Sequence, residues 1–243
     1  MIQLLQPLKA DSLKDVFVSR FEQLILSGDV SIGEKLPSER ELAIRLGVSR
    51  PVVHEGLLEL ATKGLVTIWP RKGTVVNDFR KEGSLALLNS LVNYQGGLDP
   101  SLLENLLDMR HLFEAEIVRL AARHGTRDQL GAIGDIVSSE EKALADPDAF
   151  SELDFEFHHA LAMASGNDLY PLLLNSFRQI YHHLAGQFYT VARVTSTVLD
   201  FHREILAAMK DRDAIAAEDA MGRMLDHGRR LLHEVIDKAK AQS

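Results

Sequence analysis

Three ionisable side chains in the second half of the chain stand on helix faces that are otherwise apolar. Asp154 and His158 are four residues apart in the segment FSELDFEFHHALAMASGN, which begins at Phe150. Plotted at about 100° per residue, Asp154 lies at the edge of the apolar stripe and His158 lies one turn beyond it on the same side. His202 lies inside the apolar stripe of residues 195–210. These groups need partners, because isolated burial of a carboxylate or imidazole is costly.

An aspartate and two histidines form an O, N, N ligand set that suits a divalent transition metal such as zinc. Asp154 and His158 can reach one point, because residues four apart on a helix are neighbours. His202 would join them from a facing helix. The same side chains could instead form an Asp–His hydrogen bond and a separate, satisfied core histidine. The spacing leaves both interpretations open.

Arg110 also falls within an apolar stripe, that of residues 100–124, and Glu114 borders the same stripe one turn later. One interpretation is an internal Arg110–Glu114 ion pair that joins this helix to a neighbour. The other is that the guanidinium binds the carboxylate of an effector, because its planar fork matches a carboxylate with two hydrogen bonds. Arg178, which flanks the stripe of residues 168–189, is a further candidate for effector binding.

Helices must position these side chains, since no convincing strand pattern appears in the second part of the chain. Helical periodicity recurs there, and short turns separate the runs. The runs are 84–95, 100–124, 127–145, 148–165, 168–189, 195–210 and 213–239. Short connections predict an antiparallel all-α bundle of six or seven helices. We assign this domain residues 79–243, with a short polar linker at 77–83.

The segment LPSERELAIRLGVSRPVVHEGLLELATKGLVTIWPRKGTVV has a different pattern. Ser38 and Glu41 form a capping-box pattern, and Gly47 is placed to end the first short helix. A second helix follows, and two β-rich runs then flank a basic tip at 70–73. The pattern predicts a winged helix–turn–helix in an N-terminal domain of residues 1–78, so the fold class is mainly α.

A helix–turn–helix with a basic wing is a shape that fits DNA. The second helix would meet base edges through its first residues, which are Ser49, Arg50, Pro51, Val52 and His54. Arg40 lies nearby, and Arg71, Lys72 and Gly73 of the wing would contact phosphates or the minor groove. The alternative is a winged module for protein contacts, with its arginines merely solvated.

The charge distribution allows DNA binding by the first domain. The chain of 243 residues has a net charge of −8, but residues 1–80 hold 11 Lys and Arg against 10 Asp and Glu, and residues 81–243 hold 16 against 25. The acidity therefore belongs to the second domain. Cysteine is absent, no charged-then-apolar signal precedes the first helix, and no apolar run approaches the roughly 20 residues that cross a bilayer. These features predict a soluble cytoplasmic protein.

The first domain resembles the N-terminal domain of the GntR family of bacterial transcription regulators. The family's Leu-Pro-Ser-Glu-Arg-x-Leu-Ala, Val-Ser-Arg, Gly-Leu-Val and Gly-Thr motifs are matched at residues 36–43, 48–50, 64–66 and 73–74. The resemblance implies that Arg40, Arg50 and the wing contact operator DNA. Family members usually carry arginine at the position of His54. Histidine is shorter and mostly neutral at pH 7, so operator preference or affinity should differ there.

The second domain resembles the ligand-binding domain of the FadR-type subfamily, whose signature helix is similar to the segment that contains Asp154 and His158. Many such domains hold a metal with one Asp and three His, and His202 matches the third of these ligands. The fourth falls on Met224, while His227 lies one turn on and about 60° outward. We expect zinc, with nickel or manganese as alternatives, on three protein ligands plus water or effector oxygens. Ligation by His227, or no metal, are the other outcomes.

These features predict a ligand-responsive transcription regulator, a repressor in the commoner arrangement, that binds a palindromic operator as a homodimer. The expected effector is a small carboxylate such as a sugar acid or hydroxy acid, held by the metal and by Arg110, since an arginine at this position often serves the effector in related domains. A fatty-acyl-CoA-responsive regulator without metal is the alternative. A metal-dependent hydrolase would also use an Asp/His/His metal. No nucleophile elbow, phosphate loop or pair of catalytic carboxylates accompanies it, so we do not expect an enzyme.

Overall fold

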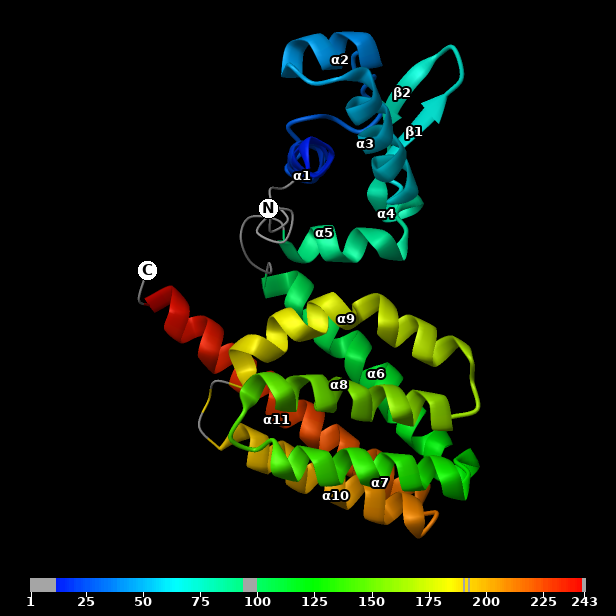
Figure 1. Cartoon of the computed structure of the whole chain (residues 1–243), viewed down its shortest axis with the longest axis vertical. Helices are drawn as coiled ribbons and strands as arrows, with labels where there is room; N and C mark the ends of the chain where they lie inside the picture. The colour runs from blue at the N-terminus through cyan, green and yellow to red at the C-terminus, as the bar shows by residue number, and fades with distance from the viewer. Residues whose placement is uncertain (1–11, 94–99, 190, 192, 242–243) are drawn as a thin grey trace, which may run out of the picture. The chain divides into compact units, whose positions relative to one another are not determined.

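The computed structural model describes residues 12–93, 100–189, 191 and 193–241. The chain forms two compact units, Met1–Leu98 and Asp99–Ser243. Among the described residues the only sheet is a two-stranded one in the first unit, and the rest of the regular structure is helical (Figure 1). The predicted fold class, a winged helix–turn–helix followed by an all-helical domain, is confirmed.

Three helices of the N-terminal unit precede the wing. They are α1 (Leu13–Leu26), α2 (Glu39–Leu46) and α3 (Arg50–Thr62), followed by β1 (Val66–Trp69) and β2 (Gly73–Val76). The strands are antiparallel and pair Val66 with Val76 and Trp69 with Gly73. Helix α1 packs on α3 through a core whose most buried side chains are Val53, Leu57, Leu60 and Leu65.

The ends of α2 follow the sequence pattern in part. The Ser38 hydroxyl accepts from the amide of Glu41 at 3.3 Å, and Gly47 adopts the left-handed φ of 67° that ends the helix. The Glu41 carboxylate pairs with Arg45 instead of returning to the amide of Ser38, so only half of the predicted capping box forms. Ser49 precedes α3 but makes no side-chain capping bond.

The segment predicted to be a polar linker is held against the end of α3. Residues Phe79–Glu82 form α4, and Ser84 donates from its amide to the carbonyl of Lys63 at 3.1 Å. Gly64 has a φ of 77°, and a Cβ there would lie 2.0 Å from the carbonyl oxygen of Glu82. Only glycine therefore lets α4 approach this turn.

The helical run predicted at 84–95 also packs with the N-terminal unit. It appears as the 3₁₀ helix η2 (Leu85–Leu87) and α5 (Leu88–Asn93), and the predicted end of the run lies outside the described residues. Leu87 is buried in the N-terminal core, with Leu91 packed against it. Packing thus divides the chain about 20 residues after the predicted boundary at 78/79, because these leucines find their apolar partners in the first unit.

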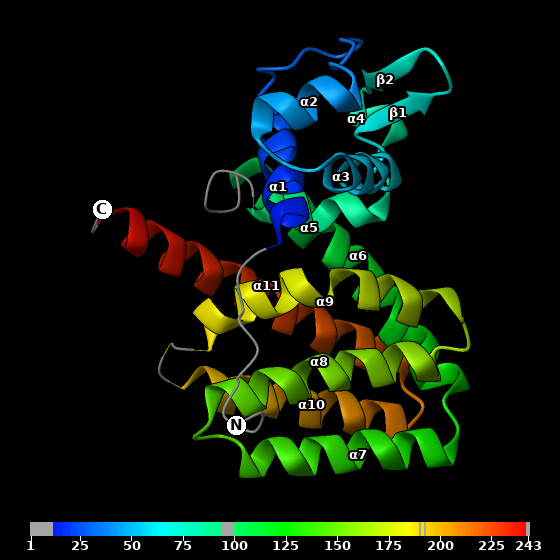
Figure 2. The same ribbon diagram turned by 45° about the horizontal axis from the view of Figure 1, so that its top comes forward.

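Six helices build the C-terminal unit within its described residues, in agreement with the predicted bundle. They are α6 (Pro100–His124), α7 (Arg127–Lys142), α8 (Pro147–Ala164), α9 (Leu169–Phe188), α10 (Val194–Lys210) and α11 (Ala214–Ala241). Helix α8 lies between α7 and α9 (Figures 1 and 2), and its third neighbour is α6. The residues that α8 turns inward therefore face α6, α7 and α9, which is where the ionisable side chains meet.

Local signals fix the start of α8. Asp146 accepts from the amide of Ala149 at 3.1 Å, and Pro147 occupies the first turn, where a missing amide costs little.

None of the described helices is long and apolar enough to cross a membrane.

Candidate effector site and DNA-binding surface

The start of α3 presents its polar side chains to solvent. Arg50 and His54 have side-chain exposures of 66% and 54%, and Glu39 of α2 lies beside both. Its carboxylate is 2.8 Å from Nδ1 of His54 and 3.9 Å from Arg50. Ser49 and Pro51 are also exposed and Val52 is half-buried, so the predicted base-reading residues share one accessible surface, while the neighbouring Val53 is buried in the core.

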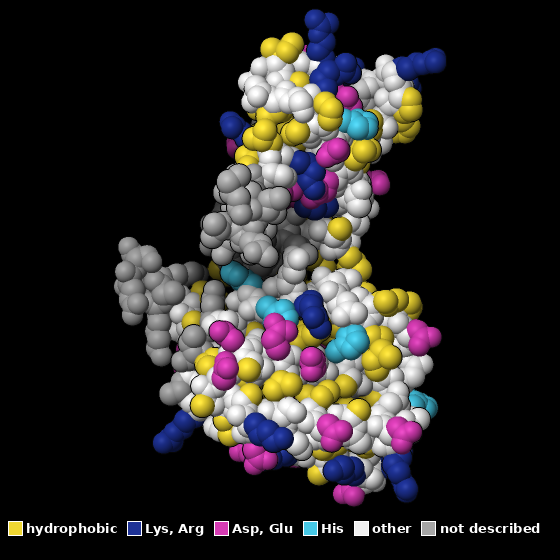
Figure 3. Space-filling view, viewed as in Figure 1, with side chains coloured by type: hydrophobic (Ala, Val, Ile, Leu, Met, Phe, Trp, Pro, Cys, Tyr) yellow, Lys and Arg dark blue, Asp and Glu magenta, His cyan; other side chains and the backbone are white. Residues whose placement is uncertain are grey.

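Further basic groups lie on α2 and at the wing tip. Arg40, Arg71 and Lys72 are exposed, and Arg71 adopts a left-handed φ of 64° in the turn between the strands. In Figure 3, Lys and Arg side chains project from the part of the N-terminal unit that holds α2 and the wing. This surface suits the phosphate backbone, whose neutralisation by Lys and Arg supplies most of the sequence-independent affinity.

The structure brings Asp154, His158 and His202 together in the interior of the C-terminal unit. One ligand atom from each lies within 4.8 Å of the others, and all three residues are buried. Oδ1 of Asp154 is 3.3 Å from Nε2 of His202 and 3.8 Å from Nε2 of His158. The second distance is too long for the Asp154–His158 hydrogen bond considered from spacing. The two imidazoles instead turn the same nitrogen toward one carboxylate.

Two further carboxylates hold the opposite sides of these imidazoles. Both carboxylate oxygens of Glu140, on α7, lie 2.9 Å from Nδ1 of His202. Glu114, on α6, contacts Nδ1 of His158. A carboxylate on Nδ1 that orients Nε2 toward a metal is the usual outer support of a histidine ligand. Sequence patterns did not identify Glu140, although it is fully buried.

The buried charges determine the protonation of this cluster. Burial opposes the charge on His202, but the neighbouring Asp154 and Glu140 carboxylates outweigh it and raise the pKa of His202 to about 9. Burial likewise disfavours the Glu114 carboxylate, yet Arg110 and His158 lower its pKa to about 2. Asp154 also has a lowered pKa despite its burial, because His202 and His158 face it. Glu114 and Asp154 are therefore ionised and His202 is protonated near neutral pH.

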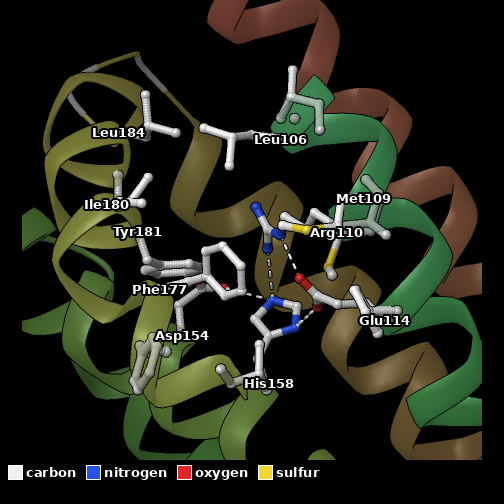
Figure 4. A pocket seen from close by; sticks show the side chains of 18 of the residues that line it. Leu106, Met109, Arg110, Glu114, Asp154, His158, Phe177, Ile180, Tyr181 and Leu184 are labelled. Carbon is white, nitrogen blue, oxygen red and sulfur yellow. Dashed lines mark hydrogen bonds and ion pairs between the residues drawn. The ribbon is translucent and has the colours of Figure 1, made fainter. Parts of the chain in front are cut away.

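Arg110 forms the predicted internal pair with Glu114 and also lines a cavity, so effector binding by its guanidinium stays a prediction. Its Nη2 lies 3.2 Å from Nε2 of His158, and its guanidinium stands over the ring of Tyr181 at 5.1 Å (Figure 4). The guanidinium thus contacts His158 through Nη2 and forms part of the cavity wall.

The cavity has a volume of about 120 Å³ and is lined mainly by α6, α8, α9 and α11. Most of its wall is Leu, Ile, Val, Phe and Met, and Met224 is part of it. The acidic, basic and histidine side chains of the lining are Arg110, Glu114, Asp154 and His158. Tyr189 is a lining residue that sequence patterns did not single out; burial and the nearby Asp154 raise its pKa well above 10, so its phenol stays protonated.

Two of the predicted site residues lie elsewhere. Arg178 is exposed, stacks on the ring of Phe155 at 4.4 Å and does not line the cavity. The ring of His227 lies 6.1 Å from that of Phe201, and His227 is not a member of the metal-ligand group. Both side chains point away because each falls on the edge of its helix's apolar stripe, where a small rotation decides the direction.

Family comparisons decide the class of protein. The family described as bacterial regulatory proteins, gntR family, matches residues 14–76, and the FadR C-terminal domain matches residues 77–238. The chain belongs to the GntR family of transcription regulators. This regulator therefore has a DNA-binding and an effector domain, and its family consists of transcription regulators, not enzymes.

Two fatty acid metabolism regulators are similar in sequence to most of this GntR regulator. The fatty acid metabolism regulator protein of Shewanella amazonensis is 34% identical over 173 residues, which cover 71% of this chain and 70% of that protein. The protein of the same name from Escherichia coli O1:K1 is 31% identical over 203 residues and 83% and 80% of the two chains.

Solved structures agree with this fold. A GntR protein of Streptococcus agalactiae is 32% identical, with a TM-score of 0.50 over 89% of this chain and 99% of that one. Lar of Listeria monocytogenes is 17% identical, with a TM-score of 0.63 over 93% and 99% of the two chains. At that identity the second likeness concerns the fold alone.

The donor atoms of this regulator fit a divalent metal. Nε2 of His202 is buried and has no hydrogen-bond partner, although it points at the Asp154 carboxylate. Three carboxylates surround the site, of which Asp154 would ligate and Glu114 and Glu140 would neutralise the added charge. One oxygen and two imidazole nitrogens are the donors that zinc prefers.

Proposed function

We propose that this GntR regulator binds a palindromic operator as a homodimer in the cytoplasm and that a carboxylic acid with an apolar body releases it. The observation that carries the proposal is the apolar cavity with Arg110 at the wall it shares with the ionised histidine cluster. Two-fold assembly is proposed because one winged module offers few base contacts, and a dimer doubles them.

The apolar wall favours a fatty acid over the sugar acid or hydroxy acid expected from the sequence. A polyhydroxylated ligand would need many polar partners, because buried hydroxyls without hydrogen bonds are costly. The lining offers few polar groups away from the Arg110 end. Relatives named fatty acid metabolism regulators point to the same ligand class.

The polar end of the cavity favours a free carboxylate as the head group. Glu114, Asp154 and His158 are at most 3% exposed, so a coenzyme A moiety would not fit beside them. A carboxylate could accept from Arg110 in two parallel hydrogen bonds. A fatty-acyl-CoA with its acyl chain in the cavity is the competing ligand.

We propose further that Asp154, His158 and His202 hold a divalent metal, with zinc first and nickel or manganese as alternatives. Bound there, the metal would supply a positive Lewis-acidic centre for an effector carboxylate. Met224 stands where related domains carry a fourth ligand, and it brings no strong donor to such a metal. Affinity should therefore be lower than for a four-residue site.

Effector binding would act through packing of the bundle. Ligand that inserts between α6, α9 and α11 binds one arrangement of these helices better than another, and this difference is the coupling free energy, typically about 1–3 kcal/mol. By the same linkage, operator DNA would change the affinity for effector by an equal factor.

A thermal-shift panel with a gel-shift readout tests this function. The panel compares decanoate, decanoyl-CoA, gluconate and lactate, each with and without zinc and a chelator. We expect decanoate to raise the melting temperature and release operator DNA. A response to decanoyl-CoA alone would favour the thioester, and a response to gluconate or lactate alone would restore the hydroxy acid. No response to any of them would refute effector binding in this cavity.

A further inference from the structure

Arg110 divides its guanidinium between two buried partners. Its Nε donates to Glu114, and its Nη2 donates to Nε2 of His158 at 3.2 Å (Figure 4). Two separate nitrogens of one rigid fork thus reach a carboxylate and an imidazole at once, whereas a lysine offers one nitrogen for both acceptors.

The neighbours of His158 determine which of its nitrogens carries the proton. A carboxylate oxygen only accepts, so the contact with Glu114 requires the proton on Nδ1. A guanidinium only donates, so Nε2 presents its lone pair to Arg110. Nε2 is also the nitrogen that faces Asp154, 3.8 Å from Oδ1, and it is the one that would bind a metal.

An imidazole nitrogen has one lone pair. It can accept a hydrogen bond from Arg110 or bind a metal, but it cannot do both. We infer that Arg110 and the divalent metal compete for Nε2 of His158, so that Arg110 sets the metal affinity of this regulator. The inference rests on the metal site proposed above, and it adds that the site has a built-in competitor.

Competition need not expel Arg110 from the interior. Glu114 is 3% exposed and would still hold Nε, while Tyr181 lies under the guanidinium. Metal binding would therefore free only Nη2, at a wall of the cavity that Arg110 already lines. The freed donor needs an acceptor, and an effector carboxylate is the natural one. The metal would thus prepare the anion site as it forms its own bonds.

A contact with His158 can be separated from a general effect of positive charge. Arg110→Met removes both the charge and the contact, and it leaves the buried Glu114 carboxylate with His158 but without the guanidinium, which weakens the fold. Arg110→Lys keeps the charge and can keep the pair with Glu114, but it removes the separate Nη2 donor that reaches His158. Arg178→Met removes an exposed arginine that does not line the cavity and serves as the matched control.

The experiment measures zinc and cobalt affinity of the full-length protein and these three variants by competition with a chromophoric chelator, after circular dichroism confirms folding. We expect Arg110→Lys to bind zinc at least about tenfold more tightly than wild type, the scale on which outer partners of metal ligands act. Arg110→Met should match or exceed it, and Arg178→Met should equal wild type.

Three results would overturn the inference in different ways. If Arg110→Lys equals wild type and only Arg110→Met binds more tightly, charge alone explains the effect. If both Arg110 variants equal wild type, Nε2 is not contested, and the metal site itself stands. If no variant binds zinc or cobalt, the metal site fails, and the inference fails with it.

Discussion

The DNA-binding surface and the interior of the effector domain use charged side chains in opposite ways. On α3, Arg50 and His54 are more than half exposed, and Glu39 pairs with them in water. Such exposed pairs contribute at most about 1 kcal/mol to stability. In the bundle, Glu114, His158 and His202 are at most 3% exposed, so each depends on its partners. Substitutions on the DNA-binding surface should therefore change DNA affinity alone. Substitutions in the interior of the bundle should change both ligand or metal affinity and the free energy of unfolding.

Asp154→Ala should have the largest effect, because it breaks the interior network at its centre. His202 and His158 would both lose the carboxylate that they face. Loss of one partner of a buried ionic group typically costs about 3–5 kcal/mol of unfolding free energy. Urea denaturation would measure the loss, and metal analysis should show an emptied site.

The matched control for Asp154→Ala is Asp200→Ala. Asp200 is 75% exposed and pairs with Arg203 at 3.4 Å on the surface of α10. Its removal should change the unfolding free energy by less than about 0.5 kcal/mol. If the two variants behave alike, and metal content is unaltered in both, the contrast between surface and interior is wrong.

Arg50→Ala should reduce operator affinity without changing stability. A side chain that reads a base edge is worth about 1–3 kcal/mol of discrimination. Arg50 is well exposed, so the melting temperature should stay near wild type. Trp69 is the single tryptophan and is 53% exposed on the wing, so its fluorescence reports binding directly.

Arg45→Ala is the control for Arg50, because its side chain has the same exposure of 66% but stands on α2. It should weaken binding to all DNA sequences evenly, if at all. Unimpaired sequence-specific binding by Arg50→Ala would remove Arg50 from the base-reading surface.

Arg110→Ala should retain operator binding and lose effector-induced release. Removing a charged hydrogen-bonding partner of a carboxylate costs about 1.5–3 kcal/mol, which would shift the release curve by about ten- to more than a hundredfold. Gel shifts across a decanoate titration measure it, with Arg178→Ala beside it. An unaltered release curve would place the effector elsewhere.

Metal affinity of the buried site should rise with pH. A metal on Nε2 of His202 displaces the proton that faces Asp154 there, from an imidazolium whose pKa Asp154 and Glu140 raise to about 9. One displaced proton means about a tenfold gain in affinity per pH unit below 9. In Glu140→Gln the rise should level off at lower pH, since one of the groups that raise this pKa is gone.

The metal-free protein should show the opposite trend in stability. The folded pKa of His202 lies above the unfolded value of 6.5, so its contribution is fully present below pH 6.5 and is lost as pH rises through about 9. Denaturation of chelator-treated protein at pH 6, 7.5 and 9 checks this sign. Stability that increases over this range would contradict the network.

Helical periodicity was enough to predict that Asp154, His158 and His202 face the interior, because that prediction needs only the apolar stripe of each helix. It could not find Glu140, which lies 62 residues from His202 and joins it only because α7 packs beside α10. The sequence also could not show that the polar segment 77–83 is bound to its own unit. Asn77 and the adjacent Ser84 bond to the backbone at the end of α3, and no local pattern records such bonds.

The smallest expected effect belongs to His54, on the surface side of the comparison. Glu39 lies 2.8 Å from it and would compete with DNA for its imidazole. His54→Arg adds a permanent positive charge, so operator affinity should rise by less than about tenfold and the salt dependence should steepen by about one unit of log–log slope. The melting temperature should not change, because the side chain of His54 is exposed.

Glu39→Gln gives the complementary test of the same position. It removes the anion that faces both His54 and Arg50, so it should raise operator affinity by a similar factor while the melting temperature stays within the range of exposed substitutions. If both substitutions lower affinity, Glu39 and His54 orient Arg50 rather than withhold charge from DNA. Surface pairs in this regulator would then act by geometry, as the buried ones do.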